Sequence, residues 1–362
     1  MNGRWIRCVW QRRGILAILL WVLFLPISGL YWLGVQVRNI VYSAGAKNSR
    51  SLQQFVISIG NLTVGGTGKT PTVVWIAQEL QKCGLKVAVL SRGYRRKGNQ
   101  PRVVPPDVLK DVSDYGDEPA MMARVFGLTV AVAHSRYAAA RQVLRSASVD
   151  VFVLDDGFQH RQLRRDLDIV LLGSDSRGWV LPSGPFREPR RAIRRADFCL
   201  ITGAEQKWRR AVSSMNPNQV FHGVLEPLHL IGFELQRWKE YPLSVLARSK
   251  IVAVSAIGDP GPFYGIIHDW EGEIVDVFEF SDHHDYSSTD WQQINWAARK
   301  ADLIVTTEKD ILKLMRFPFA REKLLAVRVA MIVENGHSLI RAILERVQKK
   351  TNKTLETRVS IP

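Results

Sequence analysis

The chain has 362 residues, of which 46% are apolar and 23% charged, so its composition excludes a disordered, collagen-like or low-complexity protein. Its 50 Lys and Arg against 34 Asp and Glu give a formal net charge of +16, which favours anionic partners such as phosphorylated substrates, nucleic acid or an anionic membrane surface. Three widely spaced cysteines exclude a disulfide framework and a cysteine-based zinc site.

The amino-terminal segment from Gly14 to Val37 carries no charge and is rich in Leu, Ile, Val, Trp and Phe. It exceeds the roughly 20 apolar residues that a helix needs to cross a bilayer core, and we predict a membrane anchor over residues 1–40. A cleaved signal peptide, the alternative, has a shorter apolar region and a small-residue cleavage site. Whether the helix spans the membrane or lies in its interface stays open, because Pro26 permits a kink and basic residues flank both ends.

Beyond a polar linker, short apolar runs alternate with stretches of helical periodicity. This alternation predicts an α/β fold of the P-loop NTPase type, a mostly parallel sheet with helices on both faces. A second strand–helix series between Ile251 and Thr306 predicts a smaller α/β domain. We expect strands at residues 55–59, 87–90, 128–133, 151–154, 167–172, 198–201, 251–255, 274–280 and 303–306, with helices at 71–83, 137–144 and 291–298 and before Trp270.

The resulting domain prediction has four parts. The anchor at 1–40 precedes a nucleotide-binding core at 41–243, which is followed by the smaller α/β domain at 244–350 and a polar tail at 351–362. The boundary at Leu243 precedes the start of the second strand–helix series.

The glycine-rich stretch 60–70 directly follows the predicted strand 55–59 and precedes a predicted helix. Its glycines let backbone N–H groups turn toward phosphate oxygens, and the helix amino terminus adds partial positive charge. Thr63 stands where the strict G-x-x-x-x-G-K-[ST] pattern has its first glycine, and a glycine-rich turn without a ligand is the alternative. We predict a nucleotide site in which Lys69 reaches the outer phosphates and Thr70 places its hydroxyl on Mg²⁺. The residues of this site are Thr63, Val64, Gly65, Gly66, Thr67, Gly68, Lys69 and Thr70.

Two carboxylates, Asp155 and Asp156, follow the predicted strand 151–154. A hard cation prefers carboxylate oxygen, and the end of a buried strand is a rigid mount for it. The alternative is a simple turn, since Asp-Gly is common in turns. With the phosphate loop upstream, we predict that Thr70, Asp155 and Asp156 serve the metal.

Seven segments in order along the chain resemble the tetraacyldisaccharide 4′-kinase family, the lipid A 4′-kinases. They are Ser58–Pro71, Leu90–Tyr94, Gly116–Pro119, Asp155–His160, Gly184–Pro189, Ser281–His284 and Thr307–Asp310. The resemblance implies ATP and Mg²⁺ as cofactors and transfer of the γ-phosphoryl group to the 4′-hydroxyl of an acylated glucosamine disaccharide 1-phosphate. It also implies a place at the inner membrane of a Gram-negative bacterium, with the catalytic domains on the cytoplasmic face.

The family resemblance further implies an acid–base pair, which falls on Asp117 and His283 in this chain. A sugar hydroxyl is a poor nucleophile until a base takes its proton, and a histidine orients and tunes such a carboxylate. The alternatives are a helix cap for Asp117 and a surface loop for His283. Arg92, which follows a strand, and Arg187, inside a family segment, are candidate substrate-binding residues.

Other functions fit the motifs less well. Guanine recognition by Asn/Thr-Lys-x-Asp requires one residue between Lys and Asp, whereas Lys309 and Asp310 are adjacent. A nucleic-acid ATPase would explain the net charge, but no nucleic-acid-binding module is legible in the sequence and the apolar amino terminus would be idle. A membrane-bound P-loop ATPase acting on a protein partner is the main alternative.

Overall fold

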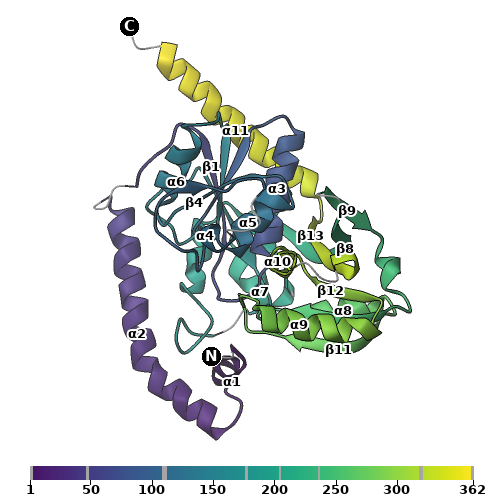
Figure 1. Ribbon diagram of the computed structural model, residues 1–362. Coiled ribbons are helices and arrows are strands. Elements are labelled where there is room, and N and C mark those ends of the chain that lie inside the picture. Colours follow the sequence, from purple (N-terminus) through teal and green to yellow (C-terminus); the bar gives the residue numbers. More distant parts are fainter. Residues whose placement is uncertain are drawn as a thin grey trace.

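The computed structural model describes residues 3–45, 49–107, 112–175, 178–203, 205–234, 237–317 and 321–359. Residues 46–48 of the predicted linker and 360–362 of the predicted tail lie outside these ranges. Within them, a 13-stranded sheet has the order β11-β10-β12-β13-β8-β7-β6-β1-β5-β2-β4-β3, with β9 paired to β8. Figure 1 shows this sheet with helices around it.

The N-terminal lobe is built on strands that run parallel to one another, with one antiparallel edge strand, β3. In chain order these are β1 (Phe55–Asn61), β2 (Val87–Ser91), β3 (Arg102–Val103), β4 (Thr129–Val132), β5 (Val151–Asp155), β6 (Leu167–Leu172) and β7 (Phe198–Ile201). The strands β1, β2, β5, β6 and β7 are buried along their whole length, as expected for a parallel sheet covered on both faces.

Helices cover both faces of this lobe because side chains alternate along each strand. Ile57 of β1 packs in one core cluster with Ile76 of α3 (Lys69–Lys82). Val56, the next residue along β1, packs in a second cluster with Ala140 of α6 (Arg136–Val143). The mostly parallel α/β fold with helices on both faces is therefore confirmed.

The C-terminal lobe continues the sheet with a second parallel set of strands. These are β10 (Lys250–Ser255), β11 (Glu273–Glu279) and β12 (Leu303–Thr307), with helices α8 (Gly261–Asp269), α9 (Ser288–Ala297) and α10 (Glu308–Leu314). The predicted elements of both lobes lie within a few residues of the observed ones. Shorter helices are α4 (Val112–Tyr115), α5 (Asp117–Arg124) and α7 (Glu205–Val212).

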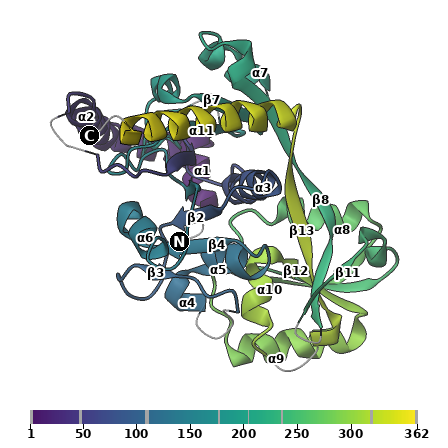
Figure 2. The same cartoon turned by 90° about the horizontal axis from the view of Figure 1, so that it is seen from above.

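The two lobes are joined by elements that the sequence pattern does not predict. β8 (Val220–Glu234) begins parallel to β7, then pairs antiparallel with β13 (Leu324–Val333) and with β9 (Arg237–Tyr241). Figure 2 shows β8 and β13 as long strands running between the lobes. The chain then returns to the N-terminal lobe in α11 (Gly336–Val359), where the Lys350 ammonium donates to Asp166 at 2.7 Å.

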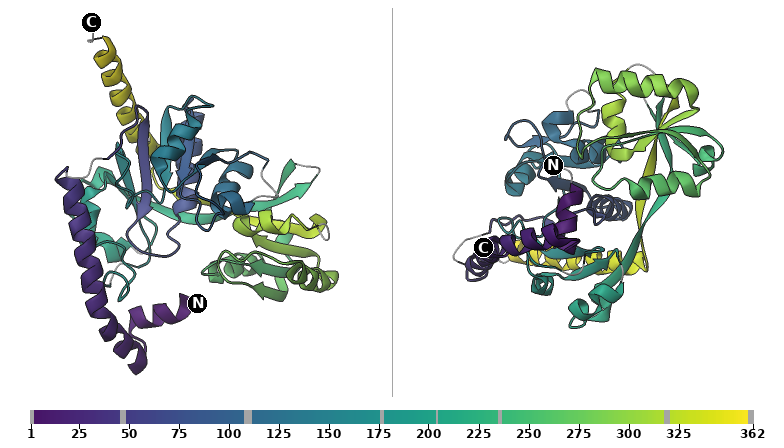
Figure 3. Two further views of the ribbon diagram at one scale, coloured as in Figure 1. Left: turned by 60° about the vertical axis from the view of Figure 1, so that its left-hand side comes forward. Right: turned by 90° about the horizontal axis from the view of Figure 1, so that it is seen from below.

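The amino terminus forms α1 (Gly3–Gln11) and α2 (Ile15–Ser43). Within the described residues, α2 is the one helix long and apolar enough to cross a membrane. Leu16, Leu23 and Leu30, spaced seven residues apart, are 70%, 66% and 72% exposed. The predicted apolar N-terminal helix is thus present, and Figure 3 shows it running along the side of the N-terminal lobe.

One side of α2 is fastened to the loop around residues 180–188. The Trp21 indole donates to the Ser183 carbonyl at 2.9 Å, and the Ser28 hydroxyl lies 2.8 Å from that of Ser183. Farther along, Arg38 pairs at 3.1 Å with Glu188, whose side chain is fully buried. One side of α2 is therefore bound to the rest of the protein along much of the helix, and another side is exposed.

Candidate active site

The phosphate loop connects β1 to α3. Gly68 has φ of +80° directly before the helix, and a Cβ at this position would lie 2.8 Å from the Met331 methyl group. Glycine is required here because the backbone is left-handed and β13 packs against the loop. By contrast, a Cβ at Gly65 or Gly66 would meet no atom within 4 Å. The predicted loop residues therefore form an open turn at a helix amino terminus.

Local hydrogen bonds hold the loop in shape. The Asn61 amide donates to the Thr67 hydroxyl at 2.9 Å, and the Thr72 hydroxyl donates to the Gly68 carbonyl at 2.7 Å. The backbone N–H of Val64 donates to the Pro185 carbonyl at 2.8 Å, which ties the loop to the segment 180–188. A preformed loop reduces the entropy that an incoming polyphosphate has to remove.

The structure brings the predicted Lys69, Asp156 and Arg187 together. The Lys69 ammonium lies 3.7 Å from Asp156 Oδ1, and the Arg187 guanidinium donates to both Asp156 oxygens, at 2.9 and 2.8 Å. Burial alone would raise the pKa of Asp156, but these two cations outweigh it and hold that pKa below its ordinary value. Asp156 is thus an ionised anchor for two cationic side chains.

Asp155, its neighbour, is in the opposite electrostatic situation. Burial raises its pKa to about 7, with help from the charges of Glu118 and Asp156. Its one side-chain hydrogen bond within the described residues comes from the Ser91 hydroxyl at 3.0 Å. A cation bound beside Asp155 would relieve this like-charge repulsion. No group of three or more His, Cys, Asp or Glu side chains in the described ranges is arranged to hold a metal alone.

The implied acid–base pair is also present as a contact. His283 Nδ1 lies 3.0 Å from Asp117 Oδ2, although 166 positions separate the two residues. Asp117 begins α5, and His283 has φ of +62° in the loop after β11. Burial alone would raise the pKa of Asp117, but the hydrogen bond from His283 and the charge of Lys313 hold it below its ordinary value. The carboxylate is therefore ionised near neutral pH.

A lysine that the sequence left without a role connects the pair to its surroundings. The Lys309 ammonium lies 3.3 Å from His283 Nε2, 3.2 Å from Glu118 and 3.5 Å from Asp282. The Ser91 hydroxyl donates to Asp155 at 3.0 Å, and the ring of Tyr94, three residues farther along, lies 5.3 Å from that of His283 between centroids. The acid–base cluster therefore lies close to Asp155 and Asp156. Lys309 and Glu118 are functional candidates whose only sequence signal is their place in the family segments.

Of the two predicted substrate-binding residues, Arg187 contacts Asp156 and Arg92 does not join that cluster through any described hydrogen bond. Arg92 is exposed and directly follows β2. Burial lowers the pKa of the Arg136 guanidinium to about 10, and the charge of Arg92 adds to this lowering. It therefore lies near the same edge of the sheet. Its role toward substrate stays a prediction.

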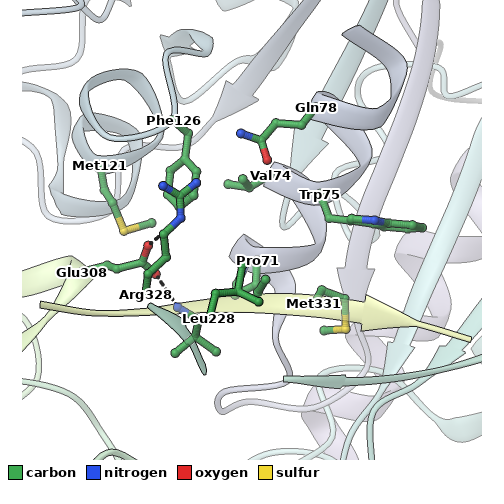
Figure 4. Close-up of a pocket in the computed structure, with 12 residues that line it drawn as sticks. Pro71, Val74, Trp75, Gln78, Met121, Phe126, Leu228, Glu308, Arg328 and Met331 are labelled. Atoms are coloured by element: carbon green, nitrogen blue, oxygen red, sulfur yellow. Dashed lines mark hydrogen bonds and ion pairs between the residues drawn. The ribbon is translucent and has the colours of Figure 1, made fainter. Parts of the chain in front are cut away.

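A cavity of about 80 Å³ lies between α3 and the strands that join the lobes. Figure 4 shows Glu308 at its wall beside the Arg328 side chain, and the backbone N–H of Val329 donates to the Glu308 carboxylate at 3.3 Å. Burial raises the pKa of Glu308 to about 7, against smaller opposing effects from that N–H and from Arg328. Glu308 thus lies where the two lobes join, in contact with β13, and has a structural role there.

A strand–glycine loop–helix unit in a parallel sheet, with a Lys and an Asp pair at the edge, defines a P-loop nucleotide-binding protein. The Asp–His pair beside that loop is suited to activating an acceptor hydroxyl, which makes a phosphotransferase the class that fits best.

The comparisons with known proteins identify the family. The model of the Tetraacyldisaccharide-1-P 4′-kinase family matches residues 20–348, so the chain belongs to this family and the predicted resemblance is confirmed. A tetraacyldisaccharide 4′-kinase of Syntrophus aciditrophicus is 38% identical over 316 residues, covering 81% of this chain and 84% of the relative. Another, of Actinobacillus succinogenes, is 32% identical and covers 95% and 98% of the two chains.

A solved structure shares the fold. The crystal structure of the "apo" form of LpxK from Aquifex aeolicus in complex with ATP matches with a TM-score of 0.76 and 31% identity. The match covers 91% of this chain and 99% of that one. The P-loop α/β fold with its second, smaller part is thus common to both proteins.

Proposed function

We propose that this protein transfers the γ-phosphoryl group of ATP to the 4′-hydroxyl of a tetraacyldisaccharide 1-phosphate, a step of lipid A biosynthesis. The observation that carries the proposal is that the phosphate loop, with Asp155 and Asp156, lies close to the Asp117–His283 pair, because Ser91 bonds Asp155 and Tyr94 packs on His283. Family membership and the ATP complex of the Aquifex aeolicus relative support the same reaction.

Each side chain has a distinct task in this reaction. Asp117 accepts the proton of the 4′-hydroxyl while the hydroxyl oxygen bonds to the γ-phosphorus. The bond from that phosphorus to the β–γ bridging oxygen breaks, and its electron pair stays on the departing ADP. Lys69 and the N–H groups of the loop stabilise the negative charge on the phosphoryl oxygens. His283 orients the Asp117 carboxylate.

The residues at the corner fit a magnesium ion. Mg²⁺ prefers oxygen ligands and is commonly held by one or two carboxylates together with substrate phosphates. The Asp155 carboxylate and the Thr70 hydroxyl would hold the ion. Burial and neighbouring carboxylates raise the pKa of Asp155. Asp156 is engaged with Lys69 and Arg187. Bound there, the ion would offset the charge that develops on the transferring group.

We also propose that α2 attaches the enzyme to the membrane that carries its lipid acceptor. Its exposed leucines would enter the apolar layer, and the side bonded to residues 180–188 would keep the site at the surface. The formal charge of +16 favours an anionic membrane surface. This arrangement corresponds to the cytoplasmic face of the inner membrane of a Gram-negative bacterium.

Incubation of the purified protein with Mg²⁺, γ-labelled ATP and the tetraacyldisaccharide 1-phosphate tests the proposal. We expect the label in the lipid. Label only in free phosphate would favour the alternative, a membrane-bound ATPase acting on a protein partner. Lys69→Ala is the control for a contaminating kinase, because it removes the ammonium that faces the phosphates.

A further inference from the structure

The Asp117 carboxylate is bonded unequally at its two oxygens. Oδ2 accepts from His283 Nδ1 at 3.0 Å and from the Lys313 ammonium at 2.9 Å. Within the described residues, Oδ1 has no hydrogen-bond partner. One oxygen is therefore engaged by two donors, and the other is free to receive a proton.

Lys313 is held rigidly for this contact. Its side chain is 6% exposed, and its ammonium also donates to the His284 carbonyl at 2.9 Å and lies 3.6 Å from Asp310 Oδ1. A buried ammonium is costly unless it is paired and hydrogen-bonded. These partners surround the charge and restrict where it can point.

Asp310 anchors this arrangement to the C-terminal lobe. Its side chain is fully buried, and its Oδ2 accepts from the Ala256 N–H at 3.0 Å and from the Thr307 hydroxyl at 2.7 Å. The ends of β10 and β12 thus fix Asp310, which with the His284 carbonyl fixes Lys313. The chain of contacts ends at Asp117, across the boundary between the lobes.

We infer that Lys313 is a positioning residue for phosphoryl transfer, which keeps Asp117 ionised and turned so that its free oxygen faces the acceptor hydroxyl. This inference rests on the proposed function. Burial opposes the ionised form of Asp117, whereas the hydrogen bond from His283 favours it. The Asp117 charge in turn acts on Lys309 and Tyr286 nearby. Lys313 differs from Lys309 because it bonds the carboxylate directly.

A merely structural role for Lys313 makes a different prediction. Lys323 serves as the matched control, because its ammonium donates to the backbone carbonyls of Ala298 and Ala301 at 3.2 and 2.7 Å, in the same lobe. Lys323 is half-buried, whereas Lys313 is buried. If Lys313 served only to hold the C-terminal lobe together, Lys313→Met and Lys323→Met should both change kcat by a factor that does not depend on pH.

The experiment measures lipid-transfer kcat between pH 5.5 and 9 for the full-length wild type, Lys313→Met, Lys313→Gln, Lys313→Arg, Lys323→Met and Asp117→Asn. The ratio of variant to wild-type kcat cancels groups that titrate alike in both proteins. Removing the Lys313 charge raises the pKa of Asp117, so the ratio for Lys313→Met should fall as the pH falls, reaching about tenfold loss at the acid end. KM for ATP should stay within about threefold, since the phosphate loop is unchanged.

We expect Lys313→Arg to restore most of the activity and Lys323→Met to keep a ratio near one at every pH. Lys313→Gln retains a donor without the charge, so it provides the same test should Lys313→Met not fold. A ratio independent of pH in both neutral variants, with Asp117→Asn inactive, would overturn the inference about Lys313 alone. Near-normal turnover of Asp117→Asn would instead overturn the base assignment, and with it this inference.

Discussion

The phosphate corner, which comprises the loop 60–70 with Asp155 and Asp156, lies close to the acid–base cluster of Asp117, His283 and Lys313. The two regions are built in different ways. The phosphate loop is one continuous segment between β1 and α3. Asp155 is the last residue of β5, the strand paired with β1, and Asp156 directly follows it. The acid–base cluster draws Asp117 from α5, His283 from a loop and Lys313 from α10. A contiguous motif therefore builds the nucleotide site, whereas the site for the acceptor depends on how the two lobes meet.

This difference decides what loss of a residue should do. A variant in the phosphate corner should impair nucleotide binding and transfer together, because we propose that Lys69 and the loop bind the polyphosphate. A variant in the acid–base cluster should impair transfer alone, because the role proposed for its residues is to activate the acceptor hydroxyl. The predictions below separate these two outcomes.

The largest effect is expected for Lys69→Ala, which removes the ammonium 3.7 Å from Asp156. Lipid phosphorylation should fall by at least about 1,000-fold, because the variant lacks the charge that stabilises the phosphoryl group. A labelled-ATP transfer assay measures it, with Lys82→Ala on the exposed end of α3 as the control. Near-normal turnover would remove Lys69 from the phosphate site.

His283→Ala should have a smaller effect of about 30- to 100-fold on kcat, because it removes one of the two donors to Asp117 Oδ2 and leaves the base itself. KM for ATP should stay near the wild-type value. Steady-state kinetics with varied ATP check this split, and His268→Ala on the exposed end of α8 is the control. An increase in the KM for ATP with kcat unchanged would place His283 in the nucleotide site instead.

Arg187→Gln should raise the KM for the lipid about tenfold if this guanidinium contacts an anionic group of the acceptor. Asp156 would keep its ion pair with Lys69, so kcat should change less than KM. Kinetics with varied lipid test this, with Arg209→Gln in α7 as the control. An unchanged KM for the lipid would limit Arg187 to anchoring Asp156.

The smallest effect concerns stability rather than activity. Burial raises the folded-state pKa of Glu308 to about 7, so its stabilising contribution is complete below its ordinary pKa and is lost as the pH rises through about 7. Glu308→Gln carries no ionisable carboxyl, and its stability relative to wild type should rise between pH 5 and 8 by at most about 3 kcal/mol. Chemical denaturation at both pH values measures it; a stability of Glu308→Gln relative to wild type that falls or stays constant from pH 5 to pH 8 would contradict the raised pKa.

Much of the fold follows from the sequence because its central strands are short apolar runs with clear ends. β6 and β7 match the predicted ranges 167–172 and 198–201 residue for residue. β8 escapes prediction because its burial does not alternate regularly and Pro227 interrupts its apolar residues. The division into domains at residue 243 stays a prediction, since β8 and β13 run between the lobes and α11 returns to the first.

For the site, local motifs indicate the phosphate corner from residue types and spacing alone. Asp117 and His283 are paired only through family resemblance, because no local pattern links residues 166 positions apart. Lys313 lies outside the family segments and has no sequence signal. Its role depends on a buried ion pair between lobes, which only the three-dimensional arrangement reveals.

The central claim is that Asp117 is the base beside an independent nucleotide site. The most direct test of this assignment is single-turnover transfer by Asp117→Asn at a saturating ATP concentration. Equilibrium binding in the same samples shows that the ATP concentration is saturating. We predict that Asp117→Asn binds ATP within about threefold of the wild-type affinity and transfers the phosphoryl group at most about one-thousandth as fast. Transfer at the wild-type rate from the saturated variant would contradict it.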